Sequence, residues 1–245
     1  YKIYNEGKES EVRALDGVSL QIDKGEFVAI VGQSGSGKST IAKLMAGFWD
    51  ATSGTIRFGG QDIRNIPFGQ LMSEISYVAQ DNFLFDKSIR ENIRIGNPEA
   101  SDEQVETAAK AANCHDFIMQ LEQGYDTMAG DAGDRLSGGE RQRITIARAM
   151  LKQASVIILD EATAYADPEN EALIQQAISK LVAGKSLIVV AHRLNTIRNA
   201  DQILVVANGE IVGRGTHEEI LQDCPLYRKM WQDYAGSTKG DTEDV

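Results

Sequence analysis

The residues with the clearest chemical meaning form a glycine-rich run at 32–39, which reads Gly-Gln-Ser-Gly-Ser-Gly-Lys-Ser. Glycines allow successive backbone N–H groups to curl around an anion with no Cβ in the way, and a helix that begins there adds a favourable dipole. In this phosphate-loop pattern Lys38 reaches the β- and γ-phosphates of a nucleotide, and the Ser39 hydroxyl binds Mg²⁺. The loop therefore predicts a site for a nucleotide and Mg²⁺. The predicted binding residues of this loop are Gly32, Ser34, Gly35, Ser36, Gly37, Lys38, Ser39 and Thr40.

A pair of carboxylates, Asp160 and Glu161, follows the apolar run 156–159. Because that run is typical of a buried strand, both side chains should emerge at the carboxyl edge of a sheet, where open α/β sheets bind ligands. Asp160 is suited to hold Mg²⁺ through water, and Glu161 is suited to polarise the attacking water as a general base. The alternative is a strand-end pair satisfied by a loop, and the phosphate loop in the same chain argues against it.

The segment 137–140 reads Ser-Gly-Gly-Glu, which is a capping-box pattern and predicts the start of a helix. Two consecutive glycines just inside a helix cost about 1 kcal/mol each relative to alanine, so we expect a use other than helix stability. Bare N–H groups at a helix N-terminus bind anions. We therefore predict that Ser137, Gly138, Gly139 and Glu140 contact the far side of a nucleotide that another subunit holds.

Hydrophobic periodicity predicts strands that alternate with helices. Strands are expected at 27–31, 55–58, 75–79, 156–159, 186–190, 202–206 and 210–212. Helices are expected from near Lys38, over 102–121, after Ser137 and over 170–182, and the polar segment 236–245 is expected to be a frayed tail. Near-continuous apolar runs bounded by helices are typical of a parallel sheet covered on both faces, so the sequence indicates an α/β fold.

The composition indicates a folded domain with an acidic balance. The chain has 245 residues, of which 42% are hydrophobic, enough for one large domain or two packed lobes. A formal net charge of −11 disfavours nucleic acid as a partner, because clustered Lys and Arg bind its phosphates. Cys114 and Cys224 lack the spacing of a zinc site and are expected to be reduced thiols without a chemical role. No run approaches the roughly 20 apolar residues of a membrane helix, so the chain by itself is expected to be soluble and cytosolic.

The motifs resemble, in type and order, those of the ATP-binding cassette (ABC) family over about residues 1–235. The resemblance implies that ATP joins two copies of the domain and that the Ser-Gly-Gly-Glu segment of one copy caps the γ-phosphate held by the other. It also implies a Q-loop glutamine, Gln80, which contacts Mg²⁺ or the attacking water. His192 matches the switch histidine that contacts the γ-phosphate, and Asp167 matches the D-loop aspartate at the dimer seam. Ala166 stands where the family commonly has leucine.

The resemblance further implies the fold and an adenine-stacking aromatic residue. The fold is a P-loop NTPase (RecA-like) core with a mostly parallel sheet, an N-terminal antiparallel β subdomain and an inserted α-helical subdomain. In this chain the core and the β subdomain are expected at 1–80 and 151–235, and the helical subdomain at 81–150. Tyr4 is the predicted stacking residue, and Tyr1 stays open as an alternative because either ring could stack on adenine.

Within the family, the segment 81–93 looks like that of exporters whose membrane and nucleotide-binding parts share one polypeptide. This implies a second nucleotide-binding domain as partner and a transmembrane domain contacted near Gln80–Phe85 and Gly130–Gly133. It also implies a location at the cytoplasmic face of the plasma membrane. The opening, residues 11–31, looks closer to cassettes of the MacB and LolD type. A natural mosaic, an engineered fusion and ordinary divergence stay open.

Other classes of ATPase share some of these motifs. A DNA-maintenance ATPase of the SMC kind places a long coiled coil between the two motif groups, whereas the interval from Gln80 to Ser137 has no heptads. A ribosome-associated member would carry two cassettes and a basic linker, whereas this chain has one phosphate loop and a negative charge. A nucleotide-dependent regulator that does not hydrolyse ATP is harder to exclude, and Glu161 argues against it.

Overall fold

The computed structural model describes residues 1–8, 10–160, 168–191 and 193–240, and the chain divides into two compact units. Unit 1 comprises residues 1–71 and 186–245, and unit 2 comprises residues 72–185. Unit 2 is therefore larger than the helical segment expected at 81–150, because it also contains the strands and the helix that flank that segment. The expected functional subdivision at 80 and 150 stays a prediction.

Unit 1 is built around strand β3, Phe27–Val31. Strands β8 (Ser186–Val190) and β9 (Gln202–Ala207) pair with β3 in parallel, one on each side, and β10 (Glu210–Gly215) pairs with β9 in antiparallel. Residues 28–31 are 0% exposed, as a strand with neighbours on both edges and cover on both faces requires. The expected α/β fold with a mostly parallel sheet is confirmed.

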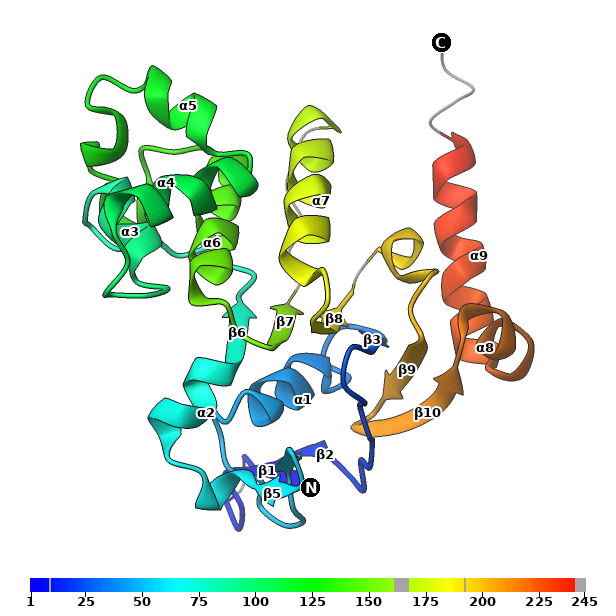
Figure 1. Ribbon diagram of the computed structural model, residues 1–245. Coiled ribbons are helices and arrows are strands. Elements are labelled where there is room, and N and C mark those ends of the chain that lie inside the picture. Colours follow the sequence, from blue (N-terminus) through cyan, green and yellow to red (C-terminus); the bar gives the residue numbers. More distant parts are fainter. Residues whose placement is uncertain (9, 161–167, 192, 241–245) are drawn as a thin grey trace. The chain divides into compact units, whose positions relative to one another are not determined.

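Helices α1 (Lys38–Met45), α8 (His217–Asp223) and α9 (Pro225–Gly240) also belong to unit 1. Figure 1 shows α8 and α9, in orange and red, beside β9 and β10. Tyr227 and Ile220 from these helices are buried against residues of β3 and β9. Helix α9 includes residues 236–240 of the segment expected to be a frayed tail, and 241–245 lie outside the described residues.

The N-terminal part of unit 1 contains two short antiparallel pairs. Strand β1 (Lys2–Tyr4) pairs with β2 (Val12–Leu15), and β4 (Arg57–Phe58) pairs with β5 (Gln61–Asp62). The strand expected at 55–58 is confined to residues 57 and 58. It ends where predicted, because the glycines at 59 and 60 both adopt positive φ, 56° and 83°, and turn the chain back. A 3-10 turn at Ile63–Asn65 follows, and then helix α2 (Phe68–Glu74), within which the chain passes from unit 1 to unit 2.

Unit 2 pairs β6 (Ile75–Val78) in parallel with β7 (Val156–Asp160) and packs helices around them. The longer helices are α6 (Gly138–Lys152) and α7 (Pro168–Val182), and the shorter ones are α3 (Ile89–Arg94), α4 (Asp102–Ala111) and α5 (His115–Gln120). Figure 1 shows α3 to α6 gathered in one group. The single helix expected over 102–121 is split, because Asn113 takes the left-handed conformation at φ 55°.

The sequence also led to expectations about the cysteines and about membrane-spanning helices. Cys114 and Cys224 are buried free thiols, as expected. Among the helices that the structure describes, none combines the length and the apolar character needed to cross a membrane.

Candidate nucleotide site

The phosphate loop of unit 1 has the predicted order of strand, loop and helix. Strand β3 ends at Val31, and α1 begins at Lys38 without a side-chain cap from the described residues. Lys38 is 5% exposed, and its Nζ donates to the carbonyl oxygens of Gly32 and Gln33 at 2.8 and 2.9 Å. These bonds hold the ammonium group inside the curl of the loop, where it can meet an anion together with the N–H groups of the helix start.

The glycines of the loop serve two different purposes. A Cβ at Gly32 would lie 2.1 Å from the carbonyl oxygen of Val206, and one at Gly37 would lie 2.7 Å from that of Ala14, so both positions exclude a side chain through packing. Gly35 adopts φ 76°, and among the described residues no atom lies within 4 Å of its Cβ position. The backbone at Gly35 can therefore approach a ligand, as a phosphate requires.

A buried hydroxyl supports the same reading of the loop. Ser36 is 6% exposed, and its Oγ has no hydrogen-bond partner among the described residues. A buried polar atom without a partner is costly in a folded protein and commonly marks a binding function. The neighbouring Ser34 is exposed, and Ser39 and Thr40 are half-buried in the first turn of α1. The donor set thus fits a polyphosphate.

The two candidate adenine-stacking tyrosines lie in different surroundings within unit 1. Tyr4, in β1, packs edge-on against Trp49 with ring centroids 5.4 Å apart, and Lys43 lies 4.9 Å from the Trp49 ring. Tyr1 is 48% exposed. The sequence reasoning missed Trp49, although a tryptophan just after α1 was a visible signal. The choice between Tyr4 and Tyr1 stays open, and Tyr4 stays the prediction.

In unit 2, Asp160 lies at the end of β7 as predicted and is 5% exposed. The phenol of Tyr77, in β6, donates to Asp160 Oδ2 at 2.5 Å. Burial and this hydrogen bond raise the pKa of Tyr77, so the phenol keeps its proton and remains a donor at neutral pH. The sequence reasoning missed Tyr77, because a tyrosine in an apolar strand predicts only packing.

The predicted capping box at the start of α6 is present in full. Ser137 N donates to Glu140 Oε2 at 2.8 Å, and Glu140 N donates to Ser137 Oγ at 3.3 Å. The two residues satisfy each other's backbone donors and fix where the helix begins. They also leave the glycines between them at the first turn, where N–H groups point out of the helix.

The two signature glycines have distinct surroundings. A Cβ at Gly139 would lie 3.0 Å from Asn170 Cγ, so α7 packs closely against α6 at this point. Arg143, one turn further along α6, donates to Asn170 Oδ1 and helps to hold that side chain in place. Of the atoms in the part of the chain that the structure describes, the one nearest to a Cβ at Gly138 is Arg141 Nη2 at 4.0 Å, which leaves room on that side. Packing therefore explains Gly139, and only Gly138 has space for an approaching phosphate.

The Q-loop glutamine, Gln80, is exposed just beyond β6. Asn82 adopts φ 48°; its Nδ2 donates to the Gln80 carbonyl at 3.3 Å, and its Oδ1 accepts from Thr145 of α6 at 3.2 Å. Leu84 is 0% exposed, while Phe83 and Phe85 on either side are 43% and 46% exposed. The loop is thus anchored at its centre and presents two aromatic rings.

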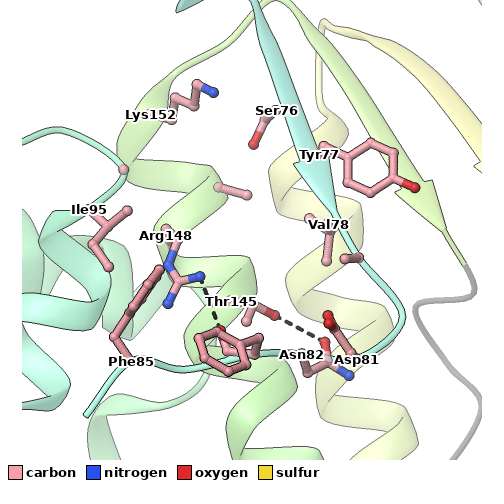
Figure 2. Close-up of a pocket in the computed structure, with 14 residues that line it drawn as sticks. Ser76, Tyr77, Val78, Asp81, Asn82, Phe85, Ile95, Thr145, Arg148 and Lys152 are labelled. Atoms are coloured by element: carbon pink, nitrogen blue, oxygen red, sulfur yellow. Dashed lines mark hydrogen bonds between the residues drawn. The ribbon is translucent and has the colours of Figure 1, made fainter. Parts of the chain in front are cut away.

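A pocket of about 340 Å³ lies beside this loop, with Phe83, Phe85, Ile95, Thr145, Arg148 and Lys152 among its lining residues. Figure 2 shows the labelled side chains of Phe85, Ile95 and Arg148 gathered on one side, whereas the Tyr77 ring points away from them. Arg148 Nε donates to the Asn92 carbonyl at 2.9 Å, and Arg148 Nη1 donates to the Phe83 carbonyl at 3.3 Å. Burial lowers the pKa of Arg148 to about 10, so it remains a cation at neutral pH.

The segment Gly130–Gly133, predicted to contact a membrane domain, forms a tight turn in unit 2. Residues Asp131–Gly133 make a 3-10 turn, in which Ala132 adopts φ 51°. Arg141 of α6 donates to the carbonyl oxygens of Gly133 and Leu136 at 3.3 and 2.6 Å. The turn is therefore tied directly to the helix that carries the signature glycines.

Three predicted site residues, Glu161, Asp167 and His192, lie outside the described residues. The phosphate loop belongs to unit 1, whereas Gln80, Asp160 and the signature segment belong to unit 2. The structure brings Asp160 together with Tyr77, and Gln80 with Asn82, as hydrogen bonds within unit 2 show.

A parallel sheet whose central strand runs into a lysine-closed glycine loop and a helix defines an α/β nucleotide-binding domain of the phosphate-loop class. The chain belongs to the ABC transporter family, whose sequence profile, described as ABC transporter, matches residues 15–164. ATP hydrolysis is the activity of this family's nucleotide-binding domain, and this chain is such an ATPase domain.

Named relatives and a solved structure agree with this assignment. The mycobactin import ATP-binding/permease protein IrtA of Mycolicibacterium smegmatis is 48% identical over 226 residues, which cover 92% of this chain and 26% of that protein. A putative multidrug export ATP-binding/permease protein of Staphylococcus aureus is 47% identical over 91% of this chain and 39% of its own length. The structure of a bacterial Atm1-family ABC exporter with ATP bound matches with a TM-score of 0.87 at 40% identity, over 95% of this chain and 40% of that one. The chain thus spans between a quarter and two fifths of these proteins.

Proposed function

We propose that this chain is the nucleotide-binding domain of an ABC exporter, and that two copies close head-to-tail around two molecules of Mg·ATP. In each site Lys38 binds the β- and γ-phosphates, and the N–H groups of the loop from Gly32 to Thr40 bind the same triphosphate. The Ser137–Glu140 segment of the second copy then approaches the γ-phosphate from the other side. Tyr4 stacks on adenine, and Asp167 lies at the seam between the copies.

The proposed chemistry divides among the polar residues at the strand ends. Ser39 binds Mg²⁺, which is part of the substrate, and Asp160 holds it through water. Gln80 contacts Mg²⁺ or the attacking water. Glu161 accepts a proton from the attacking water, a role that contributes roughly 10²- to 10⁴-fold to the rate. His192 donates to the γ-phosphate. The observation that supports binding of the triphosphate from two sides is the pair of helix starts at Lys38 and Ser137. Near each start a glycine, Gly35 or Gly138, has no described atom closer than 4.0 Å to its Cβ position.

We further propose that a transmembrane domain docks near Gln80–Phe85 and Gly130–Gly133 at the cytoplasmic face of the membrane. The exposed rings of Phe83 and Phe85 beside a pocket support this part of the proposal, because large apolar side chains at a hollow are typical of a protein interface. The identity to the named ATP-binding/permease proteins supports it as well. ATP-driven closure and opening of the pair would move that domain between two states.

The test uses Glu161→Gln, which removes the general base and keeps the size and polarity of the side chain. With saturating Mg·ATP this variant should accumulate a stable dimer on gel filtration, because ATP binds and is not consumed. The matched control adds Lys38→Ala, which should leave the double variant monomeric. Elution of Glu161→Gln as monomer at saturating Mg·ATP would contradict the proposed pairing.

A further inference from the structure

Tyr77 of β6 and Asp160 of β7 lie side by side because of the strand register. Tyr77 is paired with Ile158, and Val78 with Leu159. Side chains alternate between the faces of a sheet, so Ile158 and Asp160 share the face on which Tyr77 lies. A tyrosine that leans along its strand spans the two-residue offset, and its phenol oxygen reaches Asp160 Oδ2 at 2.5 Å.

The hydroxyl is the part of Tyr77 that packing alone does not explain. The flanking residues Ser76 and Val78 are 3% and 2% exposed, and Ile158 and Leu159 of β7 are 1% and 2% exposed. A phenylalanine would fill the same space between two apolar strands. The hydroxyl instead provides a hydrogen bond to a carboxylate that is itself 5% exposed, and bonds to ionised acceptors are stronger than neutral ones.

We propose that Tyr77 is a positioning residue for Asp160. By engaging Oδ2, the phenol fixes the torsion about the Cβ–Cγ bond and therefore the place of Oδ1. A carboxylate that holds a metal through water needs such a fixed orientation, because partners of metal-binding groups set both their geometry and their basicity. The inference rests on the proposed role of Asp160 toward Mg²⁺. If this inference is right, strand β6 contributes to metal binding through Tyr77, a residue that belongs to none of the sequence motifs described above.

The experiment measures metal affinity rather than turnover. The whole chain is titrated with Mn²⁺ in the presence of ADP, and the free Mn²⁺ is read by electron paramagnetic resonance. In Tyr77→Phe the dissociation constant for Mn²⁺ should rise about tenfold, the lower end of the effect of losing a partner of a metal-binding group. Binding of a fluorescent ADP analogue in EDTA should stay unchanged, because Tyr77 acts only through the metal.

The matched control is Tyr125→Phe in the same unit. Tyr125 is 4% exposed, and its hydroxyl is hydrogen-bonded to His115 Nδ1 at 2.8 Å, so this change also removes a hydroxyl contact from the interior. Its Mn²⁺ affinity should equal that of the unmodified chain. An equal loss in both variants would show a general effect on folding and overturn the inference. An unchanged Mn²⁺ affinity in a folded Tyr77→Phe variant would also overturn the inference.

Asp160→Asn separates this inference from the proposal on which it rests. If Asp160→Asn weakens Mn²⁺ binding and Tyr77→Phe does not, the role of Tyr77 is wrong and that of Asp160 stands. If neither change affects Mn²⁺ binding, the role of Asp160 is wrong as well. Should Tyr77→Phe not fold, Tyr77→Met offers a second side chain of similar length without a hydroxyl, for which the same tenfold loss is expected.

Discussion

At the scale of single residues, the described contacts join partners that are either close neighbours in the sequence or far apart in it. The capping box of Ser137 and Glu140 needs only four consecutive residues, and it is present as predicted. His217 is buried, and its Nδ1 is hydrogen-bonded to the Tyr227 hydroxyl, ten residues further along the chain, at 2.8 Å. Tyr77 was missed because its partner Asp160 is 83 positions away and becomes visible only with the strand register.

The two signature glycines give a prediction at this scale. Gly139→Ala should lower the free energy of unfolding by about 1–2 kcal/mol, because the overpacking against Asn170 outweighs the gain in helix propensity. Gly138→Ala should leave stability within about 0.5 kcal/mol, since its Cβ would come no closer than 4.0 Å to any described atom outside the local helix backbone. Urea unfolding of both variants measures the difference.

The same pair separates packing from function. In the Glu161→Gln background, Gly138→Ala should weaken the ATP-dependent dimer on gel filtration, because its Cβ occupies the space through which the γ-phosphate approaches. A Gly138→Ala variant that is stable and dimerises normally would contradict the binding role of this residue. Equal stability of the two alanine variants would contradict the packing role of Gly139.

At the scale of elements, hydrophobic periodicity predicted where the long strands and helices lie. Their ends depend on turns in the backbone. The strand at 27–31 and the helix after Ser137 are present as expected. The helix expected at 102–121 is interrupted, because Asn113 adopts the left-handed backbone conformation. Hydrophobic periodicity does not predict the backbone conformation of a single residue. Asn113 Nδ2 donates to the Leu173 carbonyl of α7 at 3.0 Å, so a tertiary contact accompanies the break.

The contact between α6 and the Phe83–Phe85 loop leads to the prediction at this scale. Arg148→Met should lower the free energy of unfolding by about 2–3 kcal/mol, because the carbonyl oxygens of Asn92 and Phe83 lose a charged donor while the volume is kept. Limited proteolysis should also cut the loop faster. The matched control is Arg135→Met, an exposed arginine, which should change stability by less than about 0.5 kcal/mol. Equal effects of the two changes would show that the network does not hold the loop.

At the scale of the whole molecule, the order of the motifs predicted the family and the fold class. It did not predict how the chain divides into two compact units. Patterns along the sequence are local, whereas the grouping of β6, β7 and α7 with the other helices depends on how many contacts form within each group. Composition does report one global property. The formal charge of −11 is a sum over all residues and does not depend on their arrangement.

That charge makes the proposed dimer sensitive to salt. Two copies of like charge repel each other, and the screening length falls from about 30 Å at 0.01 M salt to about 10 Å at 0.1 M. Raising NaCl over this range should therefore increase the dimer fraction of Glu161→Gln at fixed, saturating Mg·ATP, as measured by analytical ultracentrifugation. Potassium acetate at equal ionic strength is the control, since screening does not depend on the identity of the ions. A dimer that dissociates steadily as salt rises would show instead that oppositely charged pairs across the seam outweigh the repulsion between the two acidic copies.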